Sequence, residues 1–344
     1  MTTDEFTKRF RPGTTTSGYL DDRAKTEISA TGPSFDRQPT PDEIRAVMGW
    51  PAAHYEAVNE LTVRAHKIVG VSVTEFVQQR YDDRVLPTVV FIHGGAFVGG
   101  SVANVTPILQ QMADAGALRV FALDYSLAPE QPFPAGLLDV YRVVVALHQT
   151  AKQYGIDETQ LSLAGDSAGG NLTYTVALLD QNLQSNYLHK LVAMYPAVYN
   201  GHDAEKEMDF SDTQSYGAQA DQALIAQYIA SFRESTLIAD WYLQGVDDEQ
   251  MAVSPINAPA TMLAALPASL LIIGEFDPLR LEGEAFFERV RDAGGTIAYI
   301  TANYGMDVID SGVALLNMHS PWEVSSKADI YEAYRGYCAF LKDM

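Results

Sequence analysis

Cysteine, positive charge and long apolar runs are scarce in this sequence, and each scarcity excludes a class of protein. The 344 residues include one cysteine, Cys338, so no disulfide bond can form within the chain. Lys and Arg number 23 against 44 Asp and Glu, which gives a formal net charge of −21. A surface this acidic repels nucleic acids and anionic membranes, so we expect neither as a partner.

Targeting and cofactor patterns are missing as well. The first residues, MTTDEFTKRFRPG, contain no apolar stretch of the kind found in a secretory signal, and no apolar run approaches the ~18 residues of a membrane span. We therefore expect a cytoplasmic location. HExxH, Cys or His pairs at zinc spacing and Walker-type loops do not occur, so we expect no metal and no other cofactor.

Apolar, β-branched runs alternate with helical patterns through most of the chain. Strands alternating with helices predict an α/β fold with a mostly parallel central sheet covered by helices on both faces. The alternating pattern at 64–81 predicts an antiparallel pair at the sheet edge. The buried strands are expected at 88–92, within 117–125, and at 161–164, 191–195, 269–274 and 296–304, and helices at 104–115, 138–154, 171–179 and 330–341.

Two segments do not follow this alternation. Residues 1–60 are polar and turn-rich, with helical patches at 42–48 and 54–61, and they predict an N-terminal cap or arm on one domain that spans 61–344. At about 200–253 the strands stop in favour of an acidic, aromatic segment with helical patches at 221–233 and 235–243. We expect this insertion to form a lid over the carboxyl ends of the strands; the alternative is a packing embellishment.

The segment LSLAGDSAGGNL predicts a nucleophile. Its apolar run ends before Gly165-Asp166-Ser167-Ala168-Gly169, and a helical pattern follows. This is the strand–turn–helix context in which a Gly-x-Ser-x-Gly elbow exposes its serine, and the helix N-terminus favours developing negative charge. The motif alone is a weak signal, but in this setting it indicates a nucleophilic Ser167.

A second motif, His93-Gly94-Gly95-Ala96, follows a predicted strand directly. Backbone N–H groups can stabilise the oxyanion of acyl transfer, and losing one such donor costs roughly 3–4 kcal/mol. Gly94 and Gly95 are the candidate donors, with the N–H of Ala168 as a third. The alternative is a turn that ends the strand. His93 itself is expected to be structural.

The triad order of an α/β-hydrolase is Ser, acid, His. The best acid after Ser167 is Asp277 in GEFDPLR, because it follows the buried run SLLIIG and so lies at the same sheet edge as the elbow. The alternative role for Asp277 is a helix N-cap before Pro278.

Together the motifs HGGAF, DYSLAPEQPFPAGLLD, GDSAGGN, MYPAV and GEFDPLR resemble the hormone-sensitive-lipase-like family of α/β-hydrolase esterases. The resemblance runs from about residue 89 to 281 and returns in the final predicted helix. It implies an α/β-hydrolase with a helical cap that hydrolyses small short-acyl or aryl esters without a cofactor. Relatives often pair through the sheet edge, so a homodimer is among the expected states. The implied site residues are Ser167, Asp277, Gly94, Gly95 and Ala168, with Asp166 and Glu130 supporting the elbow.

The chain departs from the family at the catalytic base. The family places its histidine after a Tyr…Gly-Met-Asp segment, but here Val308 follows Asp307, and the one histidine after Asp277 is His319. In one interpretation the loop is longer and returns His319 to the site as general base. In a second interpretation the base is lost, and the oxyanion hole and substrate binding retain a rate enhancement of ~10³–10⁴-fold over water. In a third the fold has become a ligand-binding protein, as in the plant gibberellin receptors, which resemble this family and lack the same histidine. Chain order makes His319 the candidate base.

Overall fold

One mixed sheet of nine strands organises the described part of the chain. The computed structural model describes residues 6–8, 25–26, 29, 39–48, 55–201, 221–233 and 238–302. The strand order is β1-β9-β8-β7-β6-β4-β5-β3-β2. The strands are β1 (Phe6–Lys8), β2 (Leu61–Ile68), β3 (Val71–Gln78), β4 (Leu86–Ile92), β5 (Arg119–Asp124), β6 (Ile156–Asp166), β7 (Lys190–Met194), β8 (Ala268–Gly274) and β9 (Ile297–Ala302).

Most of this sheet is parallel. The neighbours from β1 through β5 in that order run parallel, whereas β3 pairs antiparallel with both β5 and β2. The predicted mostly parallel sheet with an antiparallel edge pair is confirmed. The apolar runs explain the arrangement, because the central strands are buried on both faces and so alternate little between apolar and polar residues.

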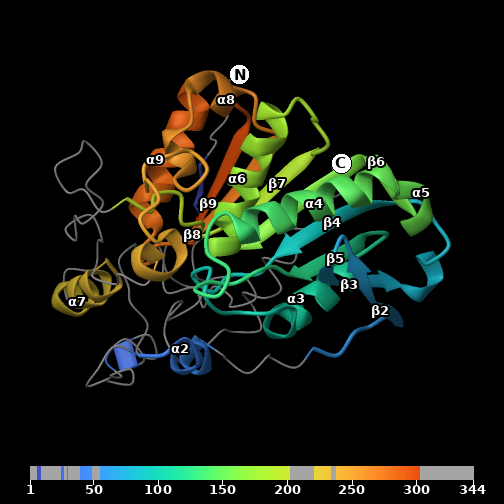
Figure 1. The fold of residues 1–344 in the computed structure, drawn as a ribbon, viewed down its shortest axis with the longest axis horizontal. Helices are drawn as coiled ribbons and strands as arrows, with labels where there is room; N and C mark the ends of the chain where they lie inside the picture. The colour runs from blue at the N-terminus through green and yellow to red at the C-terminus, as the bar shows by residue number, and fades with distance from the viewer. Residues whose placement is uncertain are drawn as a thin grey trace.

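Helices cover both faces (Figure 1). In that view α4 (Ala135–Gln149) and α6 (Ala168–Asn182) pack together above the central strands, and α3 (Val102–Asp114) lies below β3 and β5. Beside α6 on the same face, α9 (Arg280–Asp292) packs on β8 and β9, and its Phe286 ring lies 4.6 Å from that of Tyr174 in α6. The shorter elements are α2 (Pro41–Met48), α5 (Ala151–Tyr154), α7 (Gln222–Arg233), α8 (Ala260–Ala264), the 3-10 helices Gln79–Tyr81 and Pro255–Asn257, and a π-helix, η4, at Ile238–Leu243.

The apolar core fixes the strand ends in space. Val90 and Ile92 of β4 and Leu161 and Leu163 of β6 have no exposed surface. Burying each such side chain contributes about 1.5–3 kcal/mol relative to leaving it in water. Since neighbouring parallel strands end at one edge, residues that follow β4, β6 and β8 are held at the same side of the sheet.

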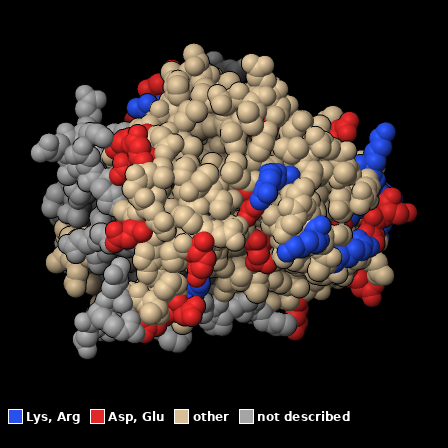
Figure 2. Space-filling model, viewed as in Figure 1, with Lys and Arg blue, Asp and Glu red and all other residues tan. Residues whose placement is uncertain are grey.

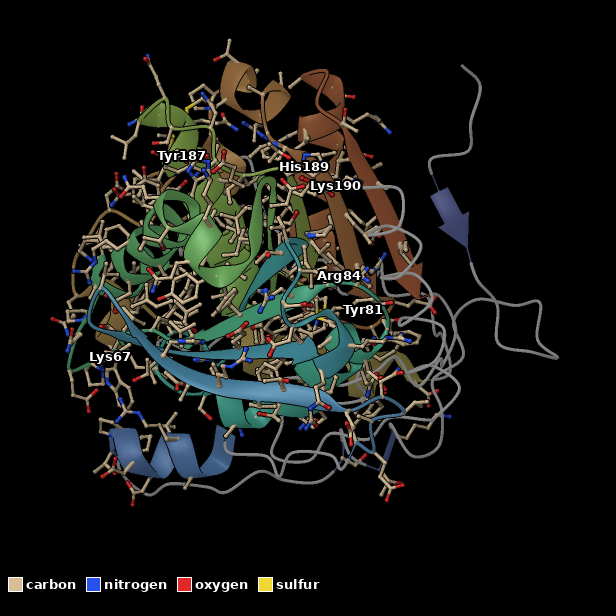
Figure 3. The ribbon with its side chains drawn as sticks, turned by 90° about the vertical axis from the view of Figure 1, so that its right-hand side faces the viewer. Lys67, Tyr81, Arg84, Tyr187, His189 and Lys190 are labelled. Carbon is tan, nitrogen blue, oxygen red and sulfur yellow. The ribbon has the colours of Figure 1, made fainter. Side chains whose placement is uncertain are left out.

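The opposite edge, where the parallel strands begin, is marked by a different set of side chains. Figure 3 shows Arg84, which precedes β4, on the same side of the molecule as His189 and Lys190 at the start of β7. The backbone N–H of His189 donates to the Leu161 carbonyl oxygen over 2.7 Å. None of the predicted site residues that the structure describes lies at this edge.

One predicted helix is wrong. Residues 55–60, part of the helical patch expected at 54–61, form no helix, and β2 begins at Leu61. The carboxylate of Asp114, at the end of α3, accepts hydrogen bonds from Tyr55 Oη (2.6 Å), Val58 N (2.7 Å) and Asn59 N (2.9 Å). Burial raises the pKa of Asp114, but these hydrogen bonds outweigh it and hold the pKa below its usual value. A partner more than fifty residues away therefore sets this backbone.

Charge is unevenly distributed over the surface. Figure 2 shows Asp and Glu side chains scattered across the whole of one face, whereas most of its Lys and Arg lie toward the side where α5 and β3 are found. Among the described residues, no helix is long and apolar enough to cross a membrane.

Candidate active site

Ser167 occupies a strained turn between β6 and α6. Its backbone angles are φ 52° and ψ −116°, a conformation that a side chain-bearing residue adopts at a cost of about 1–3 kcal/mol. The surrounding turn is held by the N–H of Ser167, which donates to Met194 O over 2.9 Å, and by the N–H of Asn171, which donates to Ser167 O over 2.9 Å. The residue is buried, and it is the N-cap of α6, directly before the first turn of that helix.

The two glycines of the motif are required by close backbone contacts. A Cβ added to Gly169 would overlap the carbonyl oxygen of Ile92, and one added to Gly165 would overlap that of Gly169 and lie 2.8 Å from that of Ile92. The elbow therefore packs directly against the end of β4. This is the structural reason for the Gly-x-Ser-x-Gly spacing in this chain.

The loop after β4 has an unusual backbone. Three consecutive residues, Gly95, Ala96 and Phe97, have φ values of 121°, 50° and 63°. The turn is closed by the N–H groups of Val98 and Gly99, which donate to Gly95 O over 3.0 and 2.9 Å. Within the described residues, no group accepts a hydrogen bond from the amides of Gly95, Ala96 or Ala168.

The predicted donor Gly94 behaves differently. Its N–H donates to Asp166 Oδ1 over 2.9 Å, so this amide is already engaged. Of the predicted pair, Gly95 alone keeps an amide without an acceptor, and the next residue, Ala96, provides a second. The sequence analysis did not single out Ala96; the signal was its place in the unbroken run HGGA.

Asp166 joins the elbow to this loop. It immediately precedes Ser167 and, through Gly94, holds the end of β4 against the end of β6. Burial raises the pKa of the Asp166 carboxyl to about 7, and the hydrogen bond from Gly94 opposes the shift. Asp166 thus contacts the loop directly, and its supporting role in catalysis stays a prediction.

Asp277 follows β8 at the same sheet edge as Ser167. Its Oδ1 accepts a hydrogen bond from Leu279 N over 2.7 Å, and its own N–H donates to Gly274 O over 3.3 Å. The N-cap of α9 is Leu279 and lacks a side-chain cap, so Asp277 closes a turn ahead of the helix and does not serve as its N-cap. A carboxylate can accept several hydrogen bonds, so this turn contact is compatible with orienting a histidine.

His93 is structural. Its ring stacks on Tyr125 with centroids 4.4 Å apart, and its Nδ1 lies 2.8 Å from Gly94 O. The hydroxyl of Tyr125 donates to His93 O over 2.9 Å. Burial lowers the pKa of the imidazole, which keeps it neutral.

Glu130 forms an ion pair with the N-terminal arm. Its carboxylate pairs with Arg45 of α2, with Nη2–Oε2 at 2.5 Å and Nη1–Oε1 at 3.0 Å. The hydrogen bond from Arg45 lowers the pKa of Glu130. The supporting role of Glu130 at the elbow stays a prediction.

The insertion reaches the same loop. Tyr242 of η4 stacks on Phe97 with centroids 4.0 Å apart and ring planes at 4°, and the Tyr242 carbonyl oxygen accepts a hydrogen bond from Phe133 N over 2.9 Å. Lys25 of the arm and Asp221 beside α7 form an ion pair of 3.0 Å. His319 and His202 lie outside the described residues. Across the described ranges, no three His, Cys, Asp or Glu side chains are grouped to hold a metal ion.

Comparison with known proteins agrees with this geometry. Residues 89–308 match a family described as having the alpha/beta hydrolase fold. The chain belongs to this family. The carboxylesterase NlhH of Mycobacterium tuberculosis is 28% identical over 214 residues, which cover 62% of this chain and 63% of that enzyme. An arylesterase of Saccharolobus solfataricus is 28% identical over 255 residues, 70% of this chain and 78% of that enzyme.

Solved structures of esterases share the fold. A thermostable esterase from Pseudomonas putida superposes with a TM-score of 0.72 at 22% identity, over 95% of this chain and 98% of that one. The predicted α/β-hydrolase fold is confirmed. The first of the matched carboxylesterases is covered over less than two thirds of its length.

A second likeness concerns the end of the chain. Residues 283–341 match the aminopeptidase I zinc metalloprotease (M18) family, which overlaps the hydrolase match at 283–308. An M18 family aminopeptidase of Clostridium acetobutylicum is 76% identical over 50 residues, 14% of this chain and 11% of that protein. His319 lies inside the aminopeptidase-like stretch and beyond the hydrolase match.

Proposed function

We propose that this protein is a serine carboxylesterase that hydrolyses small carboxylic esters, with short acyl or aryl groups, through an acyl-enzyme on Ser167. The observation that carries the proposal is the hydrogen bond from Gly94 N to Asp166. It joins the strained turn at Ser167 to a loop in which the Gly95 and Ala96 amides have no acceptor among the described residues. The esterase activity of the matched relatives supports the same chemistry.

The proposed cycle follows from these parts. Ser167 Oγ attacks the ester carbonyl carbon, and the oxyanion accepts hydrogen bonds from Gly95, Ala96 and Ala168 N–H. Relative to the sequence prediction, Ala96 takes the place of Gly94, because the Gly94 amide is spent on Asp166. The alcohol leaves with a proton, and water then attacks the acyl group and releases the acid.

Base and acid complete the proposed triad. On chain order His319 takes the proton from Ser167 Oγ, and Asp277 orients it. The likeness of residues 283–341 to aminopeptidases is a separate fact about the segment that carries His319. The role of His319 therefore needs a test of its own.

We also propose that the arm and the insertion form a cap. Lys25 pairs with Asp221, and Arg45 and Tyr242 contact the 95–98 loop from the two segments. The cap would cover the ends of the strands where the ester binds.

The test is turnover of p-nitrophenyl acetate and butyrate by the purified chain. Ser167→Ala should lower kcat by roughly 10⁴-fold or more. Ser185→Ala is the matched control, because its hydroxyl bonds Tyr141 Oη over 2.8 Å away from the elbow, and it should leave kcat unchanged. Turnover that survives Ser167→Ala would refute the proposal, as would a wild type with no turnover above background.

A further inference from the structure

The guanidinium of Arg45 joins two loops that are far apart in sequence. Its Nε donates to Val98 O over 2.7 Å, in the loop after β4, and its Nη2 donates to Ala128 O over 2.9 Å, in the loop after β5. The same group forms the two-point pair with Glu130. Four of its five N–H donors are thus used, although 28% of the side chain is exposed.

These contacts lie beside the strained backbone. Val98 directly follows the left-handed residues Gly95, Ala96 and Phe97, whose conformation must be imposed by their surroundings. A second contact between the same loops runs from Ala128 N to Phe97 O over 2.9 Å. Arg45 and the Ala128–Phe97 hydrogen bond therefore hold the two loops together, next to the Gly95 and Ala96 amides.

An ordinary surface ion pair does not account for this arrangement. An exposed Arg–Glu pair in water contributes little, and it needs no carbonyl partners. Arg45 instead binds two backbone carbonyls and a carboxylate through one planar fork, which a lysine cannot reproduce.

The helix that carries Arg45 has its own local stabilisation. Thr40 N donates to Glu43 Oε2 over 2.8 Å, and Glu43 N donates to Thr40 Oγ1 over 3.3 Å, a reciprocal cap at the start of α2. Arg45 adds an ion pair of 3.8 Å with Asp42 in the first turn, but this cap at Thr40 and Glu43 does not involve Arg45.

We propose that Arg45 is a positioning residue: it holds the 95–98 loop so that the Gly95 and Ala96 amides face the developing oxyanion. This inference rests on the proposed esterase function. It makes the N-terminal arm part of the catalytic apparatus, acting on the chemical step and not on ester binding.

The experiment compares Arg45→Met and Arg45→Lys with wild type, using p-nitrophenyl acetate at 25 °C. Sites are counted with a p-nitrophenyl alkylphosphonate, in which Ser167 Oγ bonds to phosphorus and one p-nitrophenolate leaves. Per titrated site, both variants should lower kcat about 10–100-fold while KM changes less than threefold, since small misplacements at a reacting centre cost this much. Glu130→Gln should lose less, because both carbonyl contacts of Arg45 remain.

Arg64→Met is the matched control. Arg64 also makes a two-point pair with a carboxylate, that of Asp82, but on the antiparallel edge of the sheet. It should keep kcat within twofold. The inference is overturned if Arg45→Met keeps wild-type kcat per site, if Arg45→Lys restores it, or if the loss is in KM alone. A wild type that neither turns over esters nor is labelled at Ser167 would overturn the esterase proposal first, and this inference with it.

Discussion

Residues 89–308 and residues 283–341 have relatives of different kinds. The first stretch matches α/β-hydrolases, with esterases at 28% identity, whereas the second matches M18 aminopeptidases, one of them at 76% identity over 50 residues. Ser167, Asp166, the 94–96 loop and Asp277 all precede residue 283. His319 lies in the second stretch alone. The two members of the proposed triad are therefore supported by different kinds of evidence. Ser167 is supported by the geometry of its turn, whereas His319 is supported by its order in the chain.

The overlap of the two matches is part of the folded sheet. Within 283–308, α9 buries Phe286 and Phe287, and β9 pairs in parallel with β8 from Ser269–Ile297 to Gly274–Ala302. The hydrolase architecture is thus continuous through Ala302, and the change of relatives does not interrupt the sheet.

The largest expected effect tests the base directly. If His319 serves the triad, His319→Ala should lower kcat for p-nitrophenyl acetate by roughly 10⁴-fold, because Ser167 would lose its proton acceptor. Steady-state assays with His189→Ala as control measure this. A rate within threefold of wild type would show that the aminopeptidase-like stretch does not supply the base. Added imidazole that accelerates the wild type would point to the same conclusion.

Asp277→Asn asks whether the two stretches cooperate. Replacing the orienting carboxylate should lower kcat about 10²–10⁴-fold. If Asp277 acts through His319, the double variant should be no slower than His319→Ala alone, since residues that act as a unit are non-additive. If the kcat losses of the two single variants simply add in the double variant, Asp277 does not act through His319.

Phe287→Ala tests whether the overlap belongs to the hydrolase core. Phe287 has no exposed surface, so truncation should lower the free energy of unfolding by about 3–5 kcal/mol. Its exposed neighbour Glu288 is the control, and Glu288→Ala should stay within about 0.5 kcal/mol. Urea denaturation gives both values. A cost below about 1 kcal/mol for Phe287→Ala would place the core boundary before α9.

Asp166→Asn probes the hydrolase stretch by itself. Burial raises the pKa of Asp166 from 3.8 to about 7, so the folded state holds a proton that the unfolded state releases. The associated stability is fully present below pH 3.8 and is lost as pH rises through 7. Relative to Asp166→Asn, the wild type should therefore lose up to about 4 kcal/mol between pH 4 and pH 8. Denaturation curves at several pH values give the difference in unfolding free energy between the wild type and Asp166→Asn. This pH-dependent difference should be the same when both proteins also carry His319→Ala. A difference that does not vary with pH would contradict the prediction.

Much of the fold was predictable because its signals are local. Apolar runs marked the central strands, and Gly165 and Gly169 marked the elbow by the space that they leave. Roles that depend on partners distant in the sequence could not be predicted. The engagement of the Gly94 amide depends on Asp166, 72 residues later, and nothing near Arg45 announces contacts with Val98 and Ala128. α9 was missed because the charged residues between Phe286 and Val290 obscure its buried face.

The carboxylate of Asp114 has a consequence for how motion spreads through the chain. It accepts hydrogen bonds from the amides of Val58 and Asn59, so the backbone just ahead of β2 is held in place although it belongs to no helix or strand. Those two amides should resist hydrogen–deuterium exchange about as long as the first amides of β2. The antiparallel pair of β2 and β3 is thus anchored at its start by a side chain of α3.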